Sequence, residues 1–433
     1  MRAGVVTYAF SALTLVANLT SGVISARALG PGGRGVTVAL TTVSQLAGFL
    51  FAMGVAQSLS YFIARDPRTG PRLLTTWVLM LIPLTAVAIG ISELLLPTIF
   101  PTNPHDAVEI GRWFLLTIAL VVALELNYGL MLGVHDFVAY NVLRLAQPAL
   151  MAAAFVVLWP LDALTVTSAL IAPAAATALV LVVGMWRSVR QIGLQMPDFG
   201  LGLHTLWFGV RGQGATVANH VTGRLDVAVL PAFVAAASVG LYSVATNVSL
   251  IIYQLANTFA ALVIPAAAAD TRGGARKVIG SFWAAMAVAI VLAAGLAVLA
   301  EPLLGLVYGD AFRDAAESLR LLLPGAVLFA GSSIIGAGVY AAGRPLAATL
   351  PQLLGMVVTL IGLFVFVPDG GITAAAIVSS VSYATVFVAM VATYLWITGI
   401  RGRELVPTPA RLRRLAMEPE GAEVAPGPAN DGR

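Results

Sequence analysis

The sequence predicts an all-α membrane protein with about twelve spanning helices, arranged as two six-helix pseudo-repeats. Of the 433 residues, 59% are hydrophobic and only 10% are charged, and the mean hydropathy is +0.93. A soluble chain of this size needs more polar surface, so the composition indicates a polytopic membrane protein. Two further observations support this prediction: apolar runs of about 20 residues recur along the chain, and charged positions repeat between its two halves.

Twelve apolar segments are long enough to cross a bilayer as helices, which takes about 20 residues each. Turn-forming residues lie between several of them, as in Gly30-Pro31-Gly32-Gly33 and Asp369-Gly370-Gly371. The first segment is too long for the apolar core of a signal peptide, so we expect it to be a retained helix. The twelve segments are 5–26, 36–63, 74–97, 112–132, 142–159, 164–186, 207–231, 240–266, 279–300, 319–341, 346–367 and 372–398.

The repeat defines the expected division of the chain. Charges are rare here, so charged residues that recur in the same pattern are informative. When the halves are aligned without a gap, the charged matches are Glu93 with Glu301, Asp106 with Asp314, Glu109 with Glu317, and Arg112 with Arg320. Six helices per half make the repeats parallel, a common plan for transporters. We expect an N-terminal half at 1–186, a linker at 187–206, a C-terminal half at 207–400 and a disordered tail at 401–433.

Basic residues predict the orientation, because Lys and Arg are retained in cytoplasmic loops. With the N-terminus inside, most of the arginines and Lys277 fall on inner segments, and the linker is cytoplasmic. The outer segments then hold only Arg27, Arg34, Arg112, Arg313 and Arg320. We therefore expect both termini in the cytoplasm. Arg27 and Arg34 flank the outer end of the first segment, and we expect both at the membrane interface.

Four motifs occur in order on the expected helices. They are Ala26-Arg27-Ala28-Leu29-Gly30-Pro31 with Gly33-Arg34-Gly35, Arg224-Leu225-Asp226 followed by Gly240-Leu241-Tyr242-Ser243-Val244-Ala245, Gly343-Arg344-Pro345, and Pro368-Asp369-Gly370-Gly371-Ile372 with Ala374-Ala375-Ala376. With them the chain resembles the polysaccharide (O-antigen) flippase family, within the MATE-like superfamily of multidrug, oligosaccharidyl-lipid and polysaccharide flippases. The resemblance covers nearly the whole chain except the tail.

The resemblance implies a V-shaped, MATE-like bundle of two halves in the bacterial inner membrane. It implies export of undecaprenyl-diphosphate-linked oligosaccharide repeat units for surface polysaccharide biosynthesis, by alternating access. Lipid II flippases carry two extra C-terminal helices, which we do not expect here, and this lowers that alternative. The implied partners are the polyprenyl-diphosphate-linked glycan and membrane lipids, with glycan assembly proteins as further candidates.

The seventh segment carries His220, Arg224 and Asp226 in an apolar setting. A charge within a membrane costs a few kcal/mol or more, so such residues usually mark a transport path. Arg224 and Asp226 point about 200° apart on a helix and do not face one cavity together. The guanidinium fork suits phosphate oxygens, so we expect Arg224 to contact the substrate diphosphate, with His220 on the same stripe. Asp226 is a further candidate for substrate binding. The alternative is that Arg224 and Asp226 pair with other helices.

Further polar residues lie within the expected helices. The eighth segment carries Asn247, Gln254 and Asn257 on one face, which either binds sugar hydroxyls or holds helices together. Glu125 lies well inside the fourth segment. It is a candidate for exchanging a coupling proton, as is Asp226, and its alternative role is a structural hydrogen bond.

Other classes of protein fit less well. The chain has no cysteine and only four scattered histidines, so we expect neither a metal nor a cofactor. No basic run suggests nucleic acid. A membrane glycan polymerase or ligase needs a sizeable outer loop, and every expected outer loop is short, so we expect no enzyme. A MATE-type drug or cation antiporter favours acidic residues in its cavity, whereas the intramembrane pair here includes an arginine.

Overall fold

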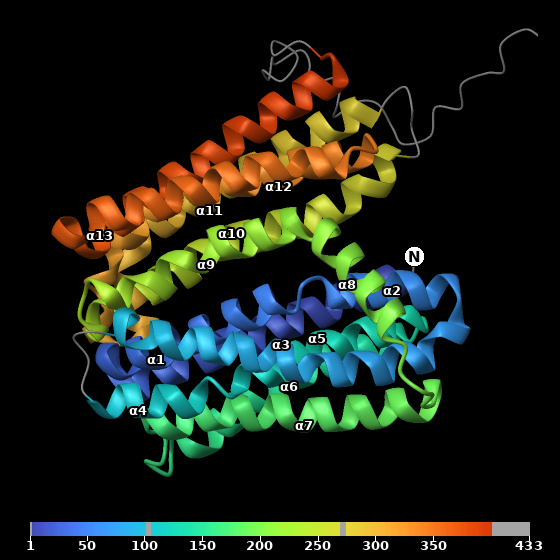
Figure 1. Ribbon diagram of the computed structural model, residues 1–433. Coiled ribbons are helices and arrows are strands. Elements are labelled where there is room, and N and C mark those ends of the chain that lie inside the picture. The colour runs from blue at the N-terminus through green and yellow to red at the C-terminus, as the bar shows by residue number, and fades with distance from the viewer. Residues whose placement is uncertain (1, 101–104, 269–273, 401–433) are drawn as a thin grey trace, which may run out of the picture.

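The computed structural model describes residues 2–100, 105–268 and 274–400, and its regular elements are all helical. Two layers of helices lie against each other (Figure 1). The first layer holds α1 (Arg2–Phe51), α2 (Val55–Arg65), α3 (Gly70–Ile99), α4 (His105–Phe114), α5 (Thr117–Gly133), α6 (Phe137–Leu158) and α7 (Val166–Ile192). The second holds α9 (Gly214–Val229), α10 (Ala236–Ala268), α11 (Gly274–Tyr308), α12 (Ala315–Ala341) and α13 (Thr349–Thr398), and α8 (Phe199–Gly212) connects the layers.

Nine helical segments of the described residues are long and apolar enough to cross a membrane. Two of them, with 54 and 53 residues, are each long enough for two crossings. They bend at Gly30 in α1 (φ 64°) and at Gly371 in α13 (φ 56°), where positive φ favours glycine. With α8 and α9 as one further crossing, the helices account for the twelve expected, and the all-α polytopic fold is confirmed.

Several boundaries differ from the expected ones. The segment expected at 207–231 is divided into α8 and α9 at Gln213, which lies between two glycines. The segment expected at 36–63 is interrupted between Phe51 and Val55. The part of the expected linker outside helices is only 193–198, because α7 and α8 extend into it. The expected tail at 401–433 lies outside the described residues.

The α8 helix packs on the first layer, although the sequence analysis divided it between the linker and the second half. Its buried stripe consists of Gly202, Thr205 and Gly209. Trp77 of α3 donates from Nε1 to Thr205 Oγ1 at 3.0 Å, and Gly209 approaches the backbone at Gly54. Small residues on this face let the helices approach closely, as is usual inside membranes.

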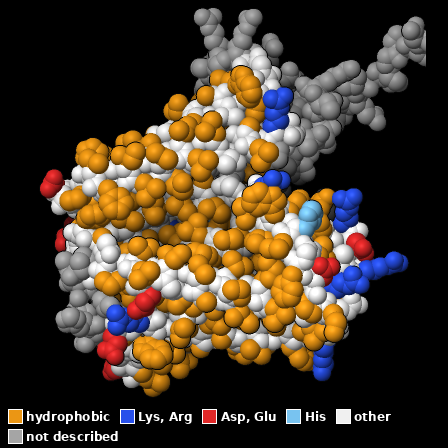
Figure 2. All heavy atoms as spheres, in the orientation of Figure 1, with side chains coloured by type: hydrophobic (Ala, Val, Ile, Leu, Met, Phe, Trp, Pro, Cys, Tyr) orange, Lys and Arg blue, Asp and Glu red, His pale blue; other side chains and the backbone are white. Residues whose placement is uncertain are grey.

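The two ends of the bundle differ in charge. We call the end with the Gly30 and Gly371 bends the kink end, and the end with residues 193–198 the linker end. In Figure 2 apolar side chains cover the middle of the visible face, and blue side chains gather towards the linker end on the right. The exposed basic residues of the linker end are Arg65, Arg68, Arg72, Arg144, Arg187, Arg190, Arg211, Lys277 and Arg344.

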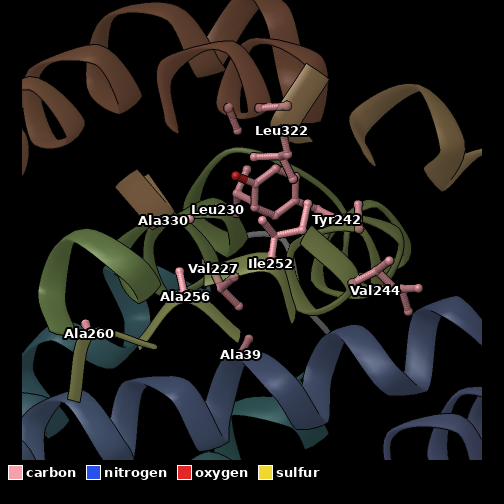
Figure 3. Packing of buried hydrophobic residues seen from close by; sticks show 14 of the residues in the cluster. Ala39, Val227, Leu230, Tyr242, Val244, Ile252, Ala256, Ala260, Leu322 and Ala330 are labelled. Carbon is pink, nitrogen blue, oxygen red and sulfur yellow. The ribbon is translucent and has the colours of Figure 1, made fainter. Parts of the chain in front are cut away.

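The centre of the packing lies on α10 and α12. The most apolar window of α12 is 83% buried, against 22% for α3 and α11, so α12 is interior while α3 and α11 face lipid. Figure 3 shows α10 between α1 and the other helices of the second layer, with Tyr242 pointing towards Leu322 and Val244 towards α1. Dispersion and close packing hold such helices together, since lipid is itself apolar.

The charged positions that recur in sequence make similar contacts in the two layers. Arg112 forms an ion pair with Glu93 through Nε at 2.8 Å. Its counterpart Arg320 donates from Nε to the carbonyl of Ala297 at 3.1 Å, one turn before Glu301. In both layers an arginine therefore reaches across to the preceding long helix at the kink end.

Candidate functional site

A cavity of about 370 Å³ lies in the second layer near the linker end. It is surrounded by α9, α10, α12, α13 and the short turn Pro345–Ala348. Among the described residues of its wall there is no acid, lysine or arginine, and the polar groups are mostly hydroxyls and amides. The wall consists of Thr216, Asn219, His220, Tyr253, Asn257, Ala260, Ser332, Ser333, Gly336, Ala337, Tyr340, Ala348, Gln352 and Met390.

Hydrogen bonds and stacked rings fix one side of this cavity. Asn219 of α9 and Tyr253 of α10 are hydrogen-bonded, with Nδ2 donating to Tyr253 Oη at 3.1 Å. The Tyr253 ring stacks on Phe329 of α12 at 4.3 Å, and Phe329 stacks on Tyr383 of α13 at 4.5 Å. Aromatic contacts of this kind contribute beyond simple burial, so α9, α10, α12 and α13 together hold the wall in place.

His220 is the point at which the first layer meets the cavity wall. Its ring stacks on Phe49 of α1 with the centroids 4.2 Å apart, and its Nδ1 lies 3.1 Å from the carbonyl oxygen of Thr216. A relative movement of the layers would separate these rings. His220 therefore links the cavity to the arrangement of the two layers.

Arg224 lies beside the cavity rather than in its wall. It is half-buried, one turn from His220 towards the kink end, and its Nη1 donates to Asn247 Oδ1 at 3.1 Å. Asn257 does line the cavity, whereas Gln254 lies on an exposed part of α10 outside the wall. The residues predicted to share one face of the eighth segment are therefore divided: Asn257 lines the cavity, and Gln254 lies outside it.

Asp226 points away from the cavity and is completely buried. One of its carboxylate oxygens accepts from Tyr242 Oη at 2.6 Å and from Ser379 Oγ at 3.1 Å. The other accepts from the Val227 backbone N–H at 2.8 Å. With three donors around it, this carboxylate joins α9, α10 and α13, which matches the architectural alternative.

Glu125 lies in the other layer, on α5. It interacts electrostatically with Tyr128 and is attracted to Arg144, and Tyr140 lies next to Tyr128. The two tyrosine rings meet edge to face with centroids 5.4 Å apart, and the Arg144 guanidinium lies 6.0 Å from the Tyr140 ring. The structure does not bring this cluster together with the cavity residues.

At the kink end the two layers are in close contact. A Cβ on Gly35 would lie 1.7 Å from the carbonyl oxygen of Ala236, and one on Gly240 would lie 2.0 Å from that of Pro31. Backbone therefore packs directly against backbone where α1 meets α10. A solute has no path between the layers at these points.

Arg34 lies inside this contact with 2% of its surface exposed, so the expectation of an interfacial position was wrong. Its Nη1 donates to Gly22 O at 2.6 Å and to Ser25 Oγ at 2.7 Å, and its Nε donates to Ser243 Oγ at 3.3 Å. The sequence contained a signal for this contact, since Arg34 and Ser243 belong to consecutive family motifs. Arg27 is exposed and donates to the carbonyls of α11.

Sequence reasoning missed Gln352, Ser332 and Ser333. They are polar residues within long apolar segments, which is the signal that could have identified them. Gln352 is 6% exposed, and its Oε1 accepts no hydrogen bond from the described residues. Within the same residues no cluster of three or more His, Asp or Glu could hold a metal ion.

Solved structures of membrane transporters have a similar fold. The fold is similar to that of the lipid II flippase MurJ in an inward closed conformation, with a TM-score of 0.75 at 13% identity, covering 93% of this chain and 89% of that one. It is also similar to an inward-facing multidrug resistance transporter of the MATE family of the MOP superfamily, with a TM-score of 0.68, 14% identity, and coverage of 93% and 95%.

A mutant of the Vibrio cholerae MATE transporter VcmN matches with a TM-score of 0.56 at 13% identity, covering 92% of this chain and 98% of that one. No curated protein sequence matches the chain. The family model of polysaccharide biosynthesis proteins matches residues 4–271, which is more than half of the chain. The chain is therefore a membrane-spanning member of the polysaccharide biosynthesis protein family.

Proposed function

We propose that this protein moves a polyprenyl-diphosphate-linked oligosaccharide across the membrane by alternating access between its two layers. The observation that carries the proposal is a cavity of hydroxyls and amides with a half-buried arginine one turn away. Neutral hydrogen-bonding groups suit a sugar, and a guanidinium suits a diphosphate. Family membership and the fold of a lipid II flippase support the same class of cargo.

We place both termini and the linker end in the cytoplasm. The nine exposed basic residues of the linker end favour this orientation by the positive-inside rule. Three tryptophans there lie under arginines, at 4.1 Å for Arg190 over Trp186, 4.6 Å for Arg211 over Trp207 and 5.9 Å for Arg344 over Trp396. Such amphipathic pairs suit a membrane interface. The cavity then faces the leaflet in which the glycan lipid is made.

The membrane potential supports export in this direction. A diphosphate carries about two negative charges, and the cell interior is negative. Each charge moved outward gains about 2.3 kcal/mol per 100 mV, so two gain roughly 4.6 kcal/mol. Glu125 remains our candidate for additional proton coupling. Asp226 is the weaker of the two candidates, because three donors already surround it.

A drug or cation antiporter of the MATE type is the second candidate, favoured by the fold alone. A cationic cargo would call for acidic groups, and the described cavity wall contains none. We infer that the protein is a transporter rather than an enzyme, and that glycan assembly proteins act on its product. An O-antigen repeat unit as the cargo is suggested by the family resemblance only.

Substitution of Arg224 tests the proposal. Arg224→Ala should abolish glycan export in a complementation assay while the protein inserts normally, and Arg224→Lys should retain part of it, because a point charge replaces the fork. Arg190→Ala, at the exposed linker end of α7, is the matched control and should export normally. Export at the wild-type rate by Arg224→Ala would contradict the role of this residue.

A liposome assay tests the driving force. Purified protein in vesicles receives a fluorescent glycan lipid, and valinomycin with a potassium gradient sets the potential. We expect flipping to accelerate when the glycan-accepting side becomes positive. Flipping that ignores the potential but depends on a proton or sodium gradient would contradict the electrical account.

A further inference from the structure

We propose that a recess in the first layer binds the acetamido group of an N-acetylated sugar, and that Gln45 provides the hydrogen bonds that recognise it. The inference rests on the proposed function and assigns a substrate class to the sugar next to the diphosphate. It concerns a substituent of that sugar, whereas Arg224 concerns the diphosphate. The two parts of the cargo can therefore be tested separately.

Gln45 is a polar side chain within the membrane that has no partner in the described part of the protein. It lies about 21 Å along α1 from Pro31, at 1.5 Å per residue. Its side chain is exposed and makes no hydrogen bond with the described residues. A carboxamide has two N–H donors and an acceptor, and leaving them unpaired in hydrocarbon is costly. Gln45 therefore requires water or a polar ligand.

The stack of Phe49 on His220 shows which way Gln45 faces. Residues four apart lie on one side of a helix, so Gln45 and Phe49 share the side of α1 that meets the second layer. On α9, Arg224 likewise lies one turn from His220. Both turns lead towards the kink end, which puts Gln45 and Arg224 at the same level of the two layers. The sugar joined to a diphosphate at Arg224 is therefore the part of the cargo nearest to Gln45.

Next to Gln45 the first layer contains a small recess of about 50 Å³, between α1, α5, α6 and α7. The polar part of its wall includes Gln45, Thr41 and Gln147, and the apolar part includes Leu120 and Pro173. Sites that hold a whole small molecule have roughly 300–1,000 Å³. The recess is much smaller, so it suits a single substituent of a sugar.

The threonines of the recess offer acceptors, whereas Gln45 offers both kinds of group. Thr41 Oγ1 donates to Thr37 O at 2.8 Å, and Thr117 Oγ1 donates to Phe114 O at 2.6 Å. The single proton of each hydroxyl is thus committed to the backbone, and only oxygen lone pairs remain for a ligand. The carboxamide of Gln45 can donate and accept at once.

An acetamido group matches this wall. Its carbonyl can accept from the Gln45 N–H groups, and its N–H can donate to Gln45 Oε1 or to a threonine oxygen. Its methyl group can pack against the apolar part of the wall at Leu120 and Pro173. A hydroxyl at the same position of the sugar leaves that apolar part unfilled. The recess therefore favours an N-acetylated sugar over its hydroxyl counterpart.

The experiment measures binding to the full-length protein in nanodiscs with three probes. They are farnesyl diphosphate, farnesyl-diphospho-glucose and farnesyl-diphospho-N-acetylglucosamine, and the two sugars differ only in the acetamido group. We expect the N-acetylated probe to bind about tenfold more tightly than the glucose probe, which corresponds to one or two net hydrogen bonds. Arg224→Ala should weaken the binding of all three probes by a similar factor.

Gln45→Met keeps the length of the side chain and removes its donors and acceptor. It should cancel the preference for the N-acetylated probe and leave farnesyl diphosphate binding unchanged. Gln191→Met, on the exposed end of α7, is the matched control and should keep the preference. If Gln45→Met does not fold, Ala174→Leu replaces it, because a larger side chain in the wall fills the recess.

A full preference for the N-acetylated probe in the variant, or equal binding of both sugars by the wild type, would overturn this assignment alone. A wild type that binds none of the probes would contradict the proposed function as well.

Discussion

The kink end and the linker end of this protein are built from opposite kinds of contact. At the kink end, backbone meets backbone at Gly35 and Gly240, and the buried Arg34 donates to three acceptors. At the linker end the layers touch at the stack of Phe49 on His220, beside a cavity lined by hydroxyls and amides. Satisfied polar groups therefore accompany the closed end, and the proposed binding cavity lies at the other end.

The comparison also separates two kinds of buried charge. Arg34 and Asp226 are both fully enclosed by donors or acceptors that hold helices together. Arg224 is half-buried and has one neutral partner, Asn247, so its charge remains available to an anion. Burial alone therefore does not separate the architectural charges from Arg224, whereas the number of hydrogen-bond partners does.

The largest effect is expected from breaking the seal. Gly240→Val places a side chain where Pro31 O lies 2.0 Å from the Cβ position, so the kink end cannot close. We expect export to fall below detection in a complementation assay, with normal insertion. Gly295→Ala, with open space around its Cβ position, is the control. Normal export by Gly240→Val would show that this contact is unnecessary.

The next effect concerns the cation within the seal. Arg34→Leu removes three hydrogen bonds from a charged donor, each contributing about 1.5–3 kcal/mol. We expect a loss of at least about 3 kcal/mol in the free energy of unfolding, measured by denaturation in nanodiscs. Arg27→Leu, on the exposed rim, should cost less. Equal costs for the two variants would contradict the burial argument.

A smaller effect is expected at the carboxylate that joins three helices of the second layer. Asp226→Asn keeps the shape but weakens the bonds from Tyr242 and Ser379, so stability should fall by about 1–3 kcal/mol. Binding of a polyprenyl-diphosphate-linked sugar should stay unchanged in the protein that folds. Weaker binding at unchanged stability would return Asp226 to the substrate site.

The smallest effect is expected at the rim of the kink end. Glu93 and Arg112 form an ion pair whose side chains are largely exposed, and such pairs contribute about 0–1 kcal/mol. Glu93→Gln should therefore change the free energy of unfolding by less than about 1 kcal/mol. Thermal denaturation of both proteins at low and high salt measures this difference. A loss of stability as large as that of Arg34→Leu would contradict the contrast between the exposed and the buried arginine.

The fold could be predicted largely from the sequence because apolar runs and glycine motifs act locally. The bends at Gly30 and Gly371 fall within two family motifs, and the spans between them have membrane length. The break at Gln213 was missed, since nothing in the apolar pattern of 207–231 distinguishes a continuous helix from two packed on different layers. An apolar residue can face either lipid or the protein interior, and hydropathy does not distinguish the two.

The candidate site was less predictable. The sequence offered His220 and Asn257 as candidate residues on two adjacent segments, and the structure places both in one cavity wall. Gln352, Ser332 and Ser333 come from helices far along the chain, and only the packing brings them to His220. The burial of Arg34 follows equally from long-range contacts with Ser243, which spacing does not reveal.

The central claim is that the cavity is open to one side while the kink end is sealed. The chain has no cysteine, so single cysteines report without background. Ser333→Cys in the cavity and Ser243→Cys in the seal can be labelled with a membrane-impermeant thiol reagent in inside-out and right-side-out vesicles. We predict that Ser333→Cys reacts from the cytoplasmic side only and that Ser243→Cys reacts from neither side. Reaction of Ser243→Cys from outside at the rate of Ser333→Cys from inside would contradict this account.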